Sequence, residues 1–114
     1  MKNKMYQTSV NQRNKLNPYL SNQILQSTPE QLFVKIYDYA IVHAEKKDMI
    51  KTNNAIQELI SILNFQDESY RELSTNLLNL YHFCQEEARK QNFDIVKNIL
   101  SELRDSWISV INSK

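Results

Sequence analysis

Glycine is absent from this chain of 114 residues, and proline occurs only twice, at Pro18 and Pro29. Average usage would give a chain of this length about eight glycines. Because strands joined by tight turns depend on glycine in those turns, this composition disfavours a mainly β fold. No strong helix breaker follows Pro29, so the rest of the chain favours helices joined by short polar turns.

Cysteine is also scarce: Cys84 is the only one, so no intramolecular disulfide can form. A lone cysteine suits a reducing compartment. Because Cys84 falls in a helical pattern with Tyr81 and Ala88, we expect a buried structural thiol and not a nucleophile. The chain has no apolar run of membrane-spanning length and does not open on a signal-peptide pattern. We therefore expect a cytoplasmic protein without membrane insertion.

The sequence also offers few polar side chains that could converge to form a catalytic site. His43 and His82 lie on different predicted helices, and no Glu-x-x-His pair of the kind that holds metals in bundles occurs. Without glycine, the chain cannot form a glycine-rich phosphate loop. An RNase of the helical-bundle toxin type typically needs an arginine followed closely by a histidine, whereas Arg71 lies far before His82. We expect no enzyme, no cofactor and no metal.

The charge is small overall, with a formal net value of +1, so we expect no nucleic-acid partner. It is unevenly placed, however, because residues 1–28 carry four bases and no acid. This segment is polar and poor in apolar residues, so we expect residues 1–27 to form a basic, mostly disordered tail.

A short apolar island interrupts the end of this tail. We expect it to pack as a flap against the bundle, either as a simple cap or as a cover that a partner displaces. The flap residues are Tyr19, Leu20, Ile24 and Leu25.

Residues 28–114 read as four amphipathic helices. The first begins near Thr28, which is a candidate N-cap followed by Pro29 at the first helical position. The second runs from about Met49 to Leu63 with Asp48 as its N-cap. The third begins near Asp67 and the fourth near Asp94. Since short links join antiparallel neighbours, we expect an all-α, antiparallel up-down four-helix bundle with a flexible N-terminal segment.

One apolar stripe per helix suffices to form the bundle core. The stripe of the first helix runs from Leu32 to Ala44 and includes Tyr37, and that of the second runs from Ile56 to Leu63. On the third helix the stripe runs from Leu73 to Ala88, and on the fourth it runs from Val96 to Ile111. Seven apolar residues lie well away from the centres of the four stripes. Such residues can line grooves that accept a partner helix, although a homodimer interface explains them equally well. These candidate partner-binding residues are Val34, Val42, Ile62, Leu78, Phe83, Ile95 and Ile108.

Several short motifs, in this order, resemble the FliS family of flagellar secretion chaperones. They are Asn17-Pro18-Tyr19, a Thr-Pro helix start at Thr28, Tyr37-Asp38-Tyr39-Ala40, the Asn-Leu…Leu-Tyr element at Asn76 to Tyr81, and Glu102-Leu103-Arg104 followed by Trp107. Each motif alone is weak, but their order and placement together are fairly specific.

The resemblance implies a cytosolic chaperone that binds the C-terminal disordered segment of flagellin. Members of that family prevent premature polymerisation of flagellin and help to deliver it to the flagellar type III export gate. The alternative that the residues leave open is a homodimeric helical adaptor unrelated to secretion.

Two features depart from the family pattern. Tyr39 stands where the family has glycine, which changes how closely another backbone can approach the first helix. The stretch between Tyr37 and Leu59 is also shorter than in typical members. We therefore expect shorter first and second helices, and a partner groove that is truncated or moved at that end of the bundle.

Overall fold

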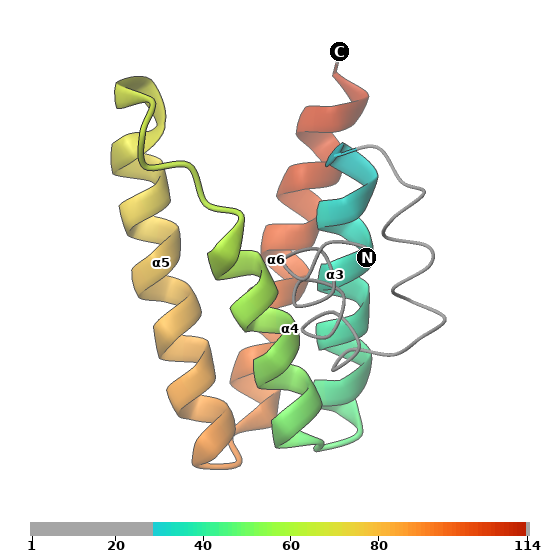
Figure 1. The fold of residues 1–114 in the computed structure, drawn as a ribbon. Helices are drawn as coiled ribbons and strands as arrows, with labels where there is room; N and C mark the ends of the chain where they lie inside the picture. The colour runs from blue at the N-terminus through green and yellow to red at the C-terminus, as the bar shows by residue number, and fades with distance from the viewer. Residues whose placement is uncertain (1–28, 114) are drawn as a thin grey trace, which may run out of the picture.

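The computed structural model describes residues 29–113, and these form four helices without a strand. Consecutive helices run in opposite directions, and each packs against two others, so that the four enclose one core (Figure 1). The predicted all-α, antiparallel four-helix bundle is confirmed. The helices are α3 (Pro29–Glu45), α4 (Met49–Ser61), α5 (Glu68–Arg89) and α6 (Phe93–Asn112).

Some predictions concern residues outside the described part of the chain. Thr28 as the N-cap of the first helix is one of them, and the basic tail of residues 1–27 is another. The flap residues Tyr19, Leu20, Ile24 and Leu25 also lie outside it.

The core combines one apolar stripe from each helix. Its largest fully buried side chains include Tyr37 of α3, Ile56 of α4, Tyr81 of α5 and Leu100 of α6. The helical spacing in the sequence placed all four inward, and the structure confirms this. Cys84 is also fully buried, as expected of a structural thiol.

Two helical hairpins close one end of the bundle with the same turn. The backbone N–H of Lys47 donates to Ala44 O at 3.0 Å, and that of Gln91 donates to Ala88 O at 2.9 Å. The residue after each donates back to the helix in the 6→1 pattern of a Schellman motif. Lys47 and Gln91 consequently adopt φ angles of 60° and 68°. Glycine, which this chain lacks, adopts such angles without steric cost.

Glycine at one of these positions should therefore stabilise the fold. We expect Gln91→Gly to raise the free energy of unfolding by about 0.5–1 kcal/mol, because the left-handed conformation costs a residue with a Cβ about 1 kcal/mol. Urea unfolding followed by circular dichroism measures this change. Asn98→Gly, at an exposed position within α6, is the control, and it should lower stability by about 0.3 kcal/mol, because glycine has a lower helix propensity than asparagine. A loss of stability in Gln91→Gly would contradict the argument.

The other end of the bundle is built differently, because α4 is short. It has 13 residues against 22 in α5, which corresponds to about 20 Å against about 33 Å. It ends at Ser61 and not at Leu63 as predicted, and Ile62 forms its C-cap. A linker of residues 62–67 then climbs from the end of α4 to the start of α5 (Figure 1).

The ends of α5 and α6 consequently project beyond α4. Leu73 of α5 and Val110 of α6, both placed in the core by their helical spacing, are 48% and 51% exposed. That prediction was wrong for these two residues, because the helix that would cover them has already ended. In Figure 1, α5 and α6 lie close together at their shared turn and diverge toward this end. We refer to it as the open end.

Candidate partner-binding site at the open end of the bundle

A hollow of about 240 Å³ lies at the open end, between the start of α5, the end of α4 and the last turns of α6. We call it the open-end cavity. Its lining is mostly apolar, with the side chains of Asn64 and Ser74 as polar exceptions. The apolar and aromatic lining residues are Phe33, Ile62, Leu63, Tyr70, Leu73, Leu77 and Trp107.

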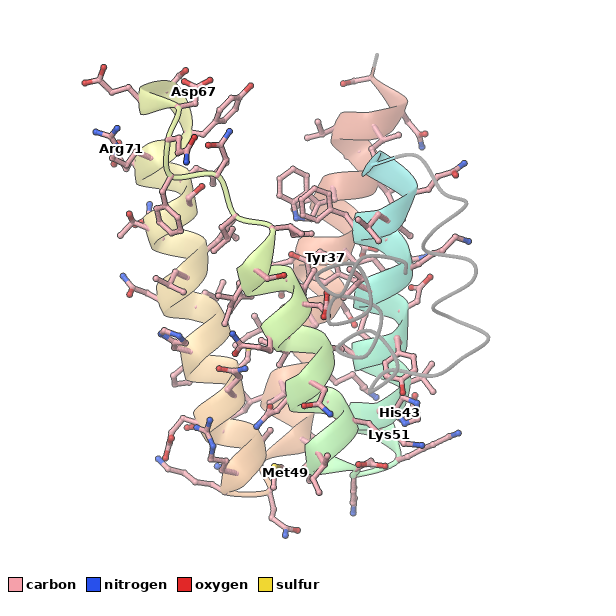
Figure 2. The ribbon with its side chains drawn as sticks, viewed as in Figure 1. Tyr37, His43, Met49, Lys51, Asp67 and Arg71 are labelled. Carbon is pink, nitrogen blue, oxygen red and sulfur yellow. The ribbon has the colours of Figure 1, made fainter. Side chains whose placement is uncertain are left out.

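Trp107 and Phe33 form an aromatic pair in the wall of the cavity. Their rings stack with centroids 5.0 Å apart and an interplanar angle of 10°. The indole N–H of Trp107 donates to the Tyr37 hydroxyl at 3.1 Å. Tyr37 lies in the middle of the bundle (Figure 2), so this bond connects the cavity wall to the core.

The Tyr37 hydroxyl also pairs with the Tyr81 hydroxyl, 2.5 Å away. Desolvation by burial raises the pKa of Tyr37 and that of Tyr81 above the usual value. Both phenols therefore stay neutral at physiological pH, and the indole N–H already has an acceptor. The polar groups behind the cavity are thus satisfied by one another, which leaves an apolar wall for a partner.

The linker wall of the cavity is held to α5 by side chains. Ser74 Oγ donates to Asn64 O at 2.6 Å, and Arg71 Nε donates to Phe65 O at 3.1 Å. Asn64 Oδ1 accepts the backbone N–H of Asp67 at 3.2 Å. Asp67 caps α5 by accepting from the backbone N–H of Ser69 at 2.9 Å, as its place in the sequence predicts. Asp67 and Arg71 lie at the top of α5 in Figure 2.

Below the cavity, amide side chains hold α5 to α4. Gln85 Nε2 donates to Gln57 Oε1 at 3.1 Å, and Asn53 Nδ2 donates to Gln85 O at 3.1 Å. These bonds lie in the half of α5 that α4 reaches. Near the start of α5 the linker takes the place of α4, with its backbone bonded to Ser74 and Arg71, which explains why the bundle opens at that end and stays closed at the other.

The seven candidate partner-binding residues do not gather on one surface of the described structure. Only Ile62 lines the open-end cavity, while Ile95 lines a more polar hollow near the α5–α6 turn. Val42, Phe83 and Ile95 are exposed, and the remaining four are half-buried: Val34, Ile62, Leu78 and Ile108. Their role in partner binding stays a prediction.

Most of the cavity could not be recognised in the sequence, because the residues that line it belong to the core stripes. Leu73, Leu77 and Trp107 have the spacing of buried residues, and spacing does not reveal where a neighbouring helix ends. The available signal was the unequal length of the helices: a stripe that begins at Leu73 on α5 has no counterpart at its level on α4. That comparison would have indicated the open end.

The described residues offer little for metal or nucleophilic chemistry. Residues 29–113 contain no group of three or more His, Cys, Asp or Glu side chains that could hold a metal ion. Burial raises the pKa of the Cys84 thiol to about 12, so it is protonated and unreactive at neutral pH. His82 is exposed. The arrangement is suited to binding apolar groups.

Tyr39 and His43 pack against each other on α3, with ring centroids 4.3 Å apart. Burial is the main reason that the pKa of His43 lies below its usual value. His43 lies at the closed end of the bundle (Figure 2), so it is remote from the open-end cavity. Within residues 29–113, no helix combines the length and the apolar character needed to cross a membrane.

Comparison with known proteins gives one finding. The family model described as flagellar protein FliS matches residues 11–114, which is most of the chain. No curated protein and no solved structure matches it.

Proposed function

The chain belongs to the FliS family of flagellar export chaperones, matched over residues 11–114, and from this membership we propose that it is a cytoplasmic chaperone for flagellin. In this proposal it binds the C-terminal, disordered segment of flagellin, prevents premature polymerisation and helps to deliver flagellin to the type III export gate. The seven candidate residues of the sequence analysis, among them Ile62 and Phe83, are proposed to contribute to client binding.

The open-end cavity is the observation that best supports this proposal. It combines an apolar lining with a rim of exposed side chains, since Tyr70 and Leu73 are 52% and 48% exposed. Large apolar side chains that line a hollow and remain accessible are typical of sites for a partner helix. An apolar residue on one face of a client helix would fill the cavity, while neighbouring residues cover its rim.

The chemistry of such a client fits reversible binding. A disordered segment that folds as it binds loses conformational entropy, so it can cover a large surface at moderate affinity. Moderate affinity allows release when the client is exported.

The test is calorimetric titration of the full chain with the C-terminal segment of flagellin from the same organism. We expect one-to-one binding with a clearly negative heat-capacity change, because apolar surface is buried. A scrambled peptide of the same composition is the control. Absence of binding at high micromolar concentration, with the protein folded by circular dichroism, would contradict the proposal and favour the homodimeric adaptor.

A further inference from the structure

A second apolar surface runs along the outer side of the bundle, between α5 and α6. Of the four neighbouring helix pairs, this one makes the least extensive contact. Four of its apolar side chains are between 43% and 51% exposed: Leu73 and Phe83 on α5, and Ile95 and Val110 on α6. Half-buried Leu80 and Ile99 lie between them. We call these six residues the α5–α6 furrow.

The two edges face each other at the turn that joins α5 and α6, and they diverge from there toward the open end (Figure 1). Glu87 on α5 accepts a hydrogen bond from Asn92 Nδ2, at the start of α6, at 2.8 Å. Leu80 and Leu73 precede Glu87 by seven and fourteen residues, which places them on the same edge of α5. On α6, Lys97 and Arg104 pair with Glu45 and Asp38 of α3. The edge of α6 that carries Lys97 and Arg104 therefore contacts α3. Helical spacing places Ile99 and Val110 on the side of α6 toward α5.

Each side of the furrow carries an acid that has no ion-pair partner in the described part of the chain. Glu72 on α5 lies beside the line of Leu73 and Phe83, and Glu102 on α6 lies beside that of Ile95 and Ile99, as helical spacing requires. Both carboxylates are exposed, and neither has an ion-pair partner within residues 29–113.

The bases of this region are engaged elsewhere. Arg71 donates to the linker carbonyl of Phe65, and Arg89 and Lys90 pair with acids of α5 itself, at 2.9 Å and 3.7 Å. Lys97 and Arg104 are turned to α3. Four of these bases are paired with acids, and Arg71, which keeps its charge, is turned toward the linker. Among the residues that the structure describes, the charge beside the furrow is therefore negative.

We propose that the α5–α6 furrow binds an amphipathic helix of a partner protein whose apolar stripe is bordered by lysine or arginine. The apolar stripe covers the six furrow residues, and the basic borders meet Glu72 and Glu102. This inference goes beyond the proposed function, because it assigns a partner of defined charge to a surface that contains two of the candidate client-binding residues, Phe83 and Ile95, and it does not depend on the partner being flagellin. The furrow meets the open-end cavity at Leu73, so one client chain could occupy both.

A second copy of this chain fits the furrow poorly. In a two-fold dimer the same surface meets itself, so the two copies would together bring four acids, Glu72 and Glu102 of each, into one interface. Like charges across an interface weaken association. The charge pattern therefore selects a basic partner.

Two synthetic helical peptides with the same leucine stripe test the proposal, one with lysine at the border positions and one with glutamate. Calorimetric titration of the full chain at low salt should show the lysine peptide binding about tenfold more tightly, and added salt should shrink this difference. The double variant Glu72→Lys/Glu102→Lys should reverse the preference, which is a matched test because both sites are exposed.

Three further variants locate the peptide. Phe83→Ser, with Ile95→Ser as a second variant should the first fail to fold, is expected to weaken the lysine peptide about tenfold. Ile50→Ser, at a 65% exposed position in the first turn of α4, lies outside the furrow and should leave the preference for lysine unchanged. Equal binding of the two peptides, or a preference that survives the charge reversal, would overturn the proposal.

The outcome is separable from that of the proposed function. If the chain prefers the lysine peptide but does not bind the flagellin segment, the result supports the furrow proposal and rejects flagellin as the client. Binding of the flagellin segment, together with equal or no binding of the two peptides, would support the chaperone and reject a basic helix in the furrow.

Discussion

Replacing Leu73 with aspartate is expected to weaken binding of the flagellin C-terminal segment about a hundredfold while the bundle remains folded. Leu73 lines the open-end cavity, borders the α5–α6 furrow and is 48% exposed. A client that covers this position would bury a carboxylate among apolar groups, which costs about 3 kcal/mol or more. In the free protein the same carboxylate faces water, so stability should fall by only about 1 kcal/mol.

Calorimetric titration measures the loss of affinity, and urea unfolding measures the stability. Ile50→Asp is the matched control, because Ile50 is a 65% exposed apolar residue in the first turn of α4, at the closed end. It should leave the affinity for flagellin unchanged. Ile62 would be a less decisive position, since it also packs against the core. Normal binding by a folded Leu73→Asp variant would exclude the open-end cavity as the client site.

The features of the structure that could be predicted from the sequence are those that depend on neighbouring residues. Asp48 and Asp67 were predictable as helix starts, because an N-cap accepts a hydrogen bond from a backbone N–H only two or three residues away. The stripe residues Ile56 and Leu100 were predictable because their spacing is local too. Each of these features depends on a few neighbouring residues, so the sequence contains all the necessary information.

The open-end cavity depends on longer distances. Whether Leu73 is buried depends on where α4 ends, and α4 lies on the far side of the linker. The truncated or moved groove was expected where the first and second helices join, which is the closed end of the bundle, and the binding residues were assigned by their distance from each stripe. Trp107 shows why this criterion failed: it lies on the stripe of α6 and nevertheless lines the cavity.

Trp107 packs against the core and also lines the open-end cavity. Its removal should therefore have the largest effect on stability. Trp107→Ala loses the stack with Phe33 and the hydrogen bond to Tyr37, and leaves a void beside a core of modest size. We expect the free energy of unfolding to fall by about 3 kcal/mol. The change must be followed by circular dichroism, because Trp107 is the only tryptophan and its fluorescence disappears with it.

Two milder variants separate the contributions of Trp107. Trp107→Phe keeps an aromatic ring against Phe33 but loses the N–H donor, and it should cost about 1 kcal/mol because Tyr37 still pairs with Tyr81. Val110→Ala, at a 51% exposed position on the same helix, should stay within about 0.5 kcal/mol of the unmodified protein. If Trp107→Ala were as mild as Val110→Ala, the indole would be a surface group, and the cavity would lack the rigid wall against which a client side chain is expected to pack.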